Sequence, residues 1–277
     1  RRGAAHHLRR GIVAGMTPAA TGRAPAHVRP FSMGTTERWI WLILLVIFAW
    51  AASRIDLTWA RFVLGLDGAA KFVHRMLPPI FNPREELVKG LWESVQIALL
   101  ASAAGLVLSL PVGLLAARNM MPGWVTWPTR LFITLCRTFH PVIVAIVFVK
   151  AVGFGALAGI LALTVASIGF LGKLFAEAIE EISMKQIEAV RATGASFANV
   201  ISFAVVPQVI FRFIGFIAYE LDSNLRNSTM VGIVGAGGIG GTLFSAFQRF
   251  DYDFVLGIVL CIIVLIMVGE VAQIAVK

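Results

Sequence analysis

Six apolar runs separated by polar segments set the pattern of this chain. Most of them reach the roughly 20 residues that a helix needs to cross a bilayer. The pattern therefore predicts an all-α, polytopic membrane protein with about six transmembrane helices, and both chain ends on the same side. The predicted spans are Trp39–Ala52, Leu91–Leu115, Leu131–Ala151, Ala156–Phe175, Val200–Leu221 and Phe254–Ala275.

The first and third runs are the least regular. The first is short for a span and follows Arg38, so it also resembles the apolar part of a signal peptide. Tryptophans near both of its ends are typical of residues at membrane interfaces and favour a span. The third run is interrupted by Arg137, His140 and Pro141, and His140 before the proline is interpreted as a helix-break residue.

Two segments between the spans have patterns of their own. Residues 53–86 are polar and mixed in charge, and they predict a surface segment with an interfacial helix around Leu57–Met76. The glycine-rich stretch Val231–Gly241 predicts a re-entrant or broken segment that lines a cavity. It contains G-x-G-x-x-G, but the chain after it is too short for the βαβ unit of a dinucleotide site.

The composition supports a membrane location. Hydrophobic residues make up 58% of the 277 residues and charged residues only 14%, against about 25% charged in an ordinary soluble domain. The core of so short a chain cannot absorb this much apolar surface, so lipid must cover part of it. The two cysteines, Cys136 and Cys261, lie inside apolar runs and indicate no disulfide framework.

The charge distribution suggests an orientation. Residues 1–38 carry seven arginines against the single acid Glu37 and predict a flexible, basic, cytoplasmic tail. The basic loop Lys185–Arg191 falls on the same side, as the positive-inside rule requires. The 53–90 loop is also rich in basic residues but falls on the other side, which conflicts with that rule. A nucleic-acid role for the tail is rejected, because nothing after residue 38 offers a soluble binding module.

The loop between the fourth and fifth spans carries the most specific motif. It resembles the signature of bacterial ABC importer permeases. That signature is Glu-Ala-Ala, three residues, Gly, nine residues, Ile, one residue and Leu-Pro. The chain keeps Glu188, Ala189, Gly194 and Pro207 at that spacing. It departs from the pattern at three positions, all with small or apolar residues: Val190, Ala204 and Val206. An ordinary amphipathic loop is the alternative interpretation.

The resemblance extends from about residue 88 to the end and is closest to permeases of phosphonate importers, on Asn224–Thr229 and Val231–Gly240. It implies a type I importer permease domain over 39–277 with a coupling loop at about 180–207. It also implies a short helix pair that docks on ABC ATPase subunits, a second copy of the permease, an extracytoplasmic binding protein, and a multi-pass location in the bacterial plasma (inner) membrane. The cargo would be phosphonate, phosphite or phosphate, moved by alternating access.

Charged residues inside membrane spans are costly and point to function. Arginine binds phosphorus oxyanions in a bidentate manner, so Arg137 and Arg226 are the best candidates for the translocation path. Arg226 has an alternative as a structural partner of Glu220 or Asp222. The other candidates for the path are polar or glycine residues: Asn227, Ser228, Gly235, Gly237 and Gly238.

Enzymatic chemistry has little support in the sequence. There is no Walker motif, no metal-ligand spacing and no catalytic constellation. We therefore expect no cofactor on this chain, with ATP and Mg²⁺ bound by the partner ATPase. Two other classes remain as alternatives: an ion-coupled secondary transporter with broken helices, and a membrane-embedded enzyme or flippase that uses Arg137 and His140.

Overall fold

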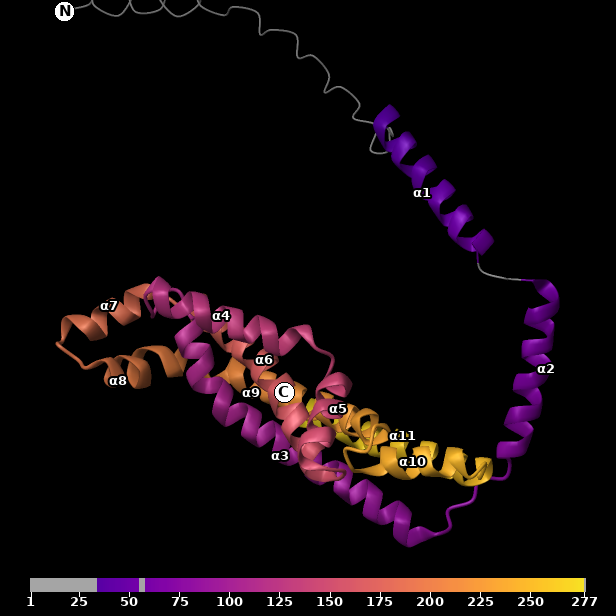
Figure 1. Ribbon diagram of the computed structural model, residues 1–277. Helices are drawn as coiled ribbons and strands as arrows, with labels where there is room; N and C mark the ends of the chain where they lie inside the picture. The colour runs from indigo at the N-terminus through magenta and orange to yellow at the C-terminus, as the bar shows by residue number, and fades with distance from the viewer. Residues whose placement is uncertain (1–33, 55–57, 277) are drawn as a thin grey trace, which may run out of the picture. The chain divides into compact units, whose positions relative to one another are not determined.

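The computed structural model describes residues 34–54 and 58–276, and within these ranges every regular element is helical (Figure 1). The predicted all-α class is confirmed. The chain divides into two compact units, residues 1–66 and 67–277. Most of the predicted basic tail, residues 1–33, lies outside the described residues.

The first unit contains helix α1 (Thr35–Arg54), which covers the first predicted span. None of its residues is buried, although its middle is almost wholly apolar. Glu37 lies in its first turn and Arg54 in its last, as the helix dipole favours. The Arg54 guanidinium lies 5.5 Å from the centre of the Trp50 ring. An exposed apolar helix of this length is suited to lipid rather than to water.

Helix α2 (Trp59–Met76) begins in the first unit and ends in the second. It confirms the helix expected around Leu57–Met76, while its interfacial position stays a prediction. The remaining elements are α3 (Arg84–Ala116), α4 (Gly123–Thr138), α5 (Pro141–Val152), α6 (Ala156–Glu180), α7 (Met184–Ala192), α8 (Phe197–Val200), a π-helical stretch (Ile201–Val205), α9 (Val206–Ile233), α10 (Ile239–Gln248) and α11 (Tyr252–Val276).

Five helical segments of the described chain are long and apolar enough to cross a membrane. A sixth is possible if α4 and α5 form one span, although they meet at 89°. The break confirms the interruption expected in the third run. Pro141 occupies the first turn of α5 and His140 is its N-cap, with Nδ1 accepting from the Val142 N–H at 3.4 Å. A residue before proline avoids helical geometry, so α4 must end there.

Helix α9 runs twelve residues beyond the predicted end of the fifth span, to Ile233. The extra turns contain the polar residues Asp222, Asn224 and Ser228, which hydropathy assigns to a loop. These side chains are buried against neighbouring helices, so the helix continues through them. Helix α10 has no counterpart among the predicted elements, because its apolar stretch is too short for a span.

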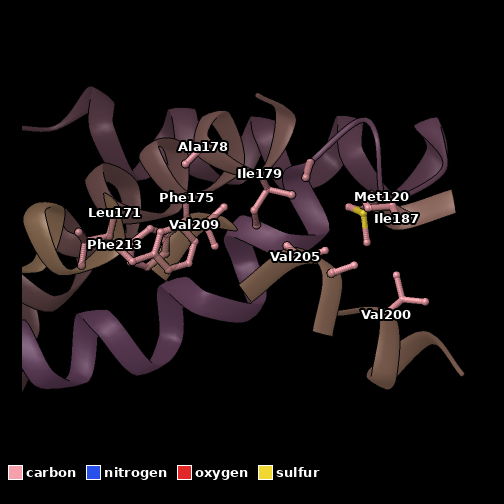
Figure 2. Packing of buried hydrophobic residues seen from close by; sticks show 12 residues of the cluster. Met120, Leu171, Phe175, Ala178, Ile179, Ile187, Val200, Val205, Val209 and Phe213 are labelled. Atoms are coloured by element: carbon pink, nitrogen blue, oxygen red, sulfur yellow. The ribbon is translucent and has the colours of Figure 1, made fainter. Parts of the chain in front are cut away.

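Small residues allow α3 and α6 to cross closely. A Cβ on Gly105 would lie 2.4 Å from the Cβ of Ser167, and one on Gly113 would lie 2.6 Å from the Cβ of Phe175. Neither distance is possible for real side chains, so glycine is required for this approach. Phe175 in turn stacks on Phe213 of α9, with ring centres 4.0 Å apart (Figure 2). The α3–α6–α9 contact is the centre of the second unit.

Candidate functional site

Helices α7 and α8 form a hairpin that projects from one end of the second unit (Figure 1). Thr193 is the C-cap of α7, and Gly194 follows it with φ +76°. A left-handed residue directly after the C-cap is a common way to end a helix, and glycine takes this conformation without strain. Ser196 then caps α8, with its side chain accepting from the Asn199 N–H at 3.5 Å.

The hairpin has a buried face and an exposed face. Ile187 of α7 and Val200 of α8 are buried in the same apolar cluster as Met120 and Ile179 (Figure 2). On the other face Glu188 and Ala189 are open to solvent. The hairpin is therefore packed onto the ends of the spans, while its predicted coupling residues Glu188, Ala189 and Gly194 remain free to meet another molecule.

A carboxylate fixes the start of the hairpin. Glu180, the last residue of α6, accepts from the Arg118 N–H at 2.7 Å and from Arg130 of α4 at 2.6 Å through the same oxygen. Arg130 also donates from Nε to the Ala116 carbonyl at 2.9 Å. These contacts join the end of α6, where the chain leaves the spans, to the end of α3 and the middle of α4.

Two further contacts join the hairpin to α9. Arg212 forms an ion pair with Glu181 at 2.5 Å, although both side chains are exposed. The Ser183 N–H donates to the side-chain oxygen of Gln208 at 3.0 Å. Pro207, the last residue of the predicted signature, lies in the first turn of α9, directly after the π-helical stretch. The signature residues thus divide between the hairpin and the helix that returns into the spans.

Arg226 is paired with an acid. Its guanidinium bonds Asp222 one turn earlier on α9, and the Asp222 side chain is only 3% exposed. Of the two partners that the sequence allowed, the structure selects Asp222. Glu220 is not the partner. It lies two residues before Asp222 on the helix and therefore points in a different direction, toward Ser167.

Glu220 belongs to a buried polar network that sequence reasoning did not anticipate. Ser167 of α6 donates to Glu220 at 2.5 Å, and Asn224 donates to both Ser167 and Ser102 at 2.9 Å. The network joins α3, α6 and α9 in the middle of the second unit. Glu220 and Asn224 lie one turn apart in α9, and this spacing is the one signal of a shared polar face in the sequence. No sequence pattern identifies their serine partners on two other helices.

The glycine-rich segment is a tight turn between α9 and α10. Gly235, Gly237 and Gly238 have φ values of +89°, +82° and +78°. The turn is packed closely: a Cβ on Gly237 would lie 2.7 Å from the Ala156 nitrogen and 2.8 Å from a Glu93 oxygen. These contacts give the glycines a packing role, and a carboxylate already lies beside the turn.

The other polar candidates are bonded within α9. Ser228 is buried and donates to the Leu225 carbonyl at 2.8 Å, and Asn227 donates to Ser223 at 3.5 Å. The structure does not bring these residues together with Arg137, which lies on α4 against Gly169 of α6. Within the described residues, no cluster of three His, Cys, Asp or Glu side chains could hold a metal ion.

The comparisons with known proteins match this arrangement. The family described as binding-protein-dependent transport system inner membrane component matches residues 109–276. The chain is 39% identical to the phosphate-import permease protein PhnE of Mycolicibacterium smegmatis, over 84% of this chain but 43% of that protein. It is 35% identical to the phosphite transport system permease protein PtxC of Stutzerimonas stutzeri, over 80% of this chain and 81% of that protein.

Solved structures show the same fold. A chain of the MetNI methionine ABC transporter in an inward-facing form covers 72% of this chain and all of its own length, with a TM-score of 0.57 and 24% identity. A bacterial ABC transporter involved in the import of alginate covers 87% of this chain, with a TM-score of 0.57 and 14% identity. At these identities the likeness concerns the fold alone.

Proposed function

Because the chain belongs to the family of binding-protein-dependent transport system inner membrane components, we propose that it is the membrane-spanning permease of an ABC importer for phosphorus oxyanions. The cargo is phosphonate, phosphite or phosphate, as the names of its relatives suggest. A family of transport components disfavours both earlier alternatives, the ion-coupled transporter and the membrane enzyme or flippase.

The observation that carries the proposal is the exposed α7–α8 hairpin with its buried inner face. Ile187 and Val200 hold it to the spans, while Glu188 is presented outward. An ATPase subunit would bind this outer face and hydrolyse ATP with its own Mg²⁺. The contacts of Glu180 and Gln208 would then transmit movement of the hairpin to α3, α4, α6 and α9. This supports alternating access between outward- and inward-open states.

The partners follow from the same proposal. A second copy of the chain would complete the path, and an extracytoplasmic binding protein would deliver the cargo. The multi-pass chain lies in the inner membrane, and we propose that its basic N-terminus is cytoplasmic. Arg137 is the favoured contact for cargo, because Arg226 already has Asp222. Roles for Asn227, Ser228, Gly235, Gly237 and Gly238 in the path stay predictions.

The test is uptake coupled to ATP. Cells that lack this chain should lose import of radiolabelled phosphate, phosphite or a phosphonate supplied as sole phosphorus source, and the wild-type gene should restore it. The tagged protein should co-purify with an ATPase whose activity rises when the loaded binding protein is added. Import that persists with ATP depleted but the proton gradient intact would contradict the proposal.

A further inference from the structure

A cavity of about 200 Å³ lies between α4 and α6, beside the last two turns of α6 before the chain continues to the hairpin. Its floor is formed by the buried residues Ala116, Ile133 and Ala176. Its rim carries three cations, Arg130, Arg137 and Lys173, together with Thr134 and the single acid Glu177. A space of this size accommodates several waters or a small oxyanion.

The three cations are in different states. Arg130 is held by Glu180 and by the Ala116 carbonyl, so its guanidinium is fixed in place. Lys173 is 3.4 Å from Glu177 on the same helix, and both side chains are about half exposed, so that pair is weak. Arg137 has no ion pair among the residues that the structure describes. The rim therefore keeps positive charge that its own acids do not neutralise.

The local packing explains why Arg137 reaches the cavity. Arg130, Thr134 and Arg137 lie four and then three residues apart on α4, a spacing that places them on one helix face. Gly169 of α6 allows this face to approach, because a Cβ there would lie 2.7 Å from the Cγ of Arg137. An arginine in a spanning helix is costly unless it meets water or an opposite charge, and the cavity provides room for both.

We propose that this cavity is a subsite for a tetrahedral phosphorus oxyanion, held by Arg137 and Lys173 on its rim. Arginine suits the planar, bidentate recognition of such groups, and lysine adds a point charge. The inference rests on the proposed function, because that function identifies the bound anion as the cargo. Arg130 on its rim bonds Glu180, directly before the hairpin that is proposed to be cytoplasmic. The cavity would therefore hold the anion on the cytoplasmic half of the path, before release. The phosphate of an anionic lipid has the same chemistry and is the other possible source.

The test uses Thr134→Cys in the full chain with Cys136 and Cys261 replaced by alanine, reconstituted into nanodiscs of phosphatidylcholine. A negatively charged thiosulfonate reagent should modify this cysteine faster than a positively charged one. Millimolar inorganic phosphate should slow the reaction, while chloride at the same ionic strength should not. Arg137→Gln combined with Lys173→Gln should lower the ratio of the two rates by at least about tenfold. Ser202→Cys, exposed on the π-helical stretch, is the control, and its ratio should not respond.

The source of the anion is decided by the lipid. Protection by phosphate in neutral nanodiscs identifies a free oxyanion. Protection without phosphate in nanodiscs that contain phosphatidylglycerol identifies a lipid headgroup. Equal rates for the two reagents with no protection in either condition would overturn the subsite. If wild-type import is normal in that case, only the subsite fails, whereas protection in a chain that does not import would reject the proposed function instead.

Discussion

The guanidinium of Arg130 lies 2.6 Å from the carboxylate of Glu180, and the same Glu180 oxygen accepts the Arg118 N–H at 2.7 Å. The two residues are fifty positions apart and come from α4 and α6. Glu180 is the last residue before the chain leaves the spans for the hairpin, and Arg130 is on the rim of the α4–α6 cavity. One carboxylate therefore connects the start of the α7–α8 hairpin with the proposed anion subsite.

Replacing Glu180 with glutamine should weaken this connection. Both side chains are about one-quarter to one-third exposed, so loss of the charge-assisted bonds should lower the free energy of unfolding by roughly 1.5–3 kcal/mol. Transport should fall further than stability explains, because movement of the hairpin no longer reaches α4. Thermal unfolding in detergent and uptake in cells would measure the two effects.

Glu181→Gln is the matched control: its pair with Arg212 is exposed and should contribute about 0–1 kcal/mol. Equal effects of the two variants would contradict the prediction.

Gly194 should tolerate asparagine but not valine. Its φ of +76° lies in the left-handed region, which asparagine accepts and β-branched residues do not. No neighbouring atom lies within 4 Å of a Cβ at this position, so conformation rather than space is limiting. We expect Gly194→Val to insert normally but to lose recovery of the ATPase in pull-down and to lose uptake, with Gly194→Asn close to wild type. Gly215→Ala, also in open space but helical, controls for a general effect of a side chain. Full activity of the valine variant would remove this turn from the coupling role.

The Arg226–Asp222 pair predicts a rescue experiment. Arg226→Gln leaves the buried Asp222 carboxylate without its cation and should destabilise the protein by roughly 1–3 kcal/mol, given that the arginine is itself 43% exposed. Adding Asp222→Asn should restore most of the stability, measured as the melting temperature, since the buried charge is removed as well. Adding Glu220→Gln instead should not. If Arg226→Gln keeps full stability and only transport is lost, Arg226 contacts cargo and the structural role is wrong.

The orientation of the chain can be tested by labelling intact cells with an impermeant thiol reagent. In a background without Cys136 and Cys261, single cysteines at Ala24 and Ser183 should be protected, because the tail and the hairpin are predicted to be cytoplasmic. A cysteine at Asp67, exposed on α2, should react. Permeabilised cells provide the control, since all three positions should then be labelled. Reaction at Ser183 from outside would contradict the proposed position of the hairpin.

Which segments form long hydrophobic helices was largely determined by the sequence, because a bilayer requires long apolar runs and these are visible in the order of the residues. The break before Pro141 was also predictable, since proline restricts its own backbone and that of the preceding residue. The helix pair α7–α8 was expected from the family resemblance carried by Glu188, Gly194 and Pro207, and its coupling role stays a prediction. Each of these features depends on residues that are near one another in the chain.

The partners of the buried polar residues were decided only by the tertiary structure. Glu220 bonds Ser167, fifty-three positions away, and Asn224 bonds Ser102, one hundred and twenty-two positions away. Hydropathy ended the fifth span at Leu221 because it scores each polar residue as if it faced water or lipid. Whether such a residue finds hydrogen-bond partners depends on which helix face packs against it. The crossing of α3, α6 and α9 at their small residues sets that contact. The packing of α4 against α6 brought Arg130, Arg137 and Lys173 to one cavity, a juxtaposition that no spacing along a single helix contains.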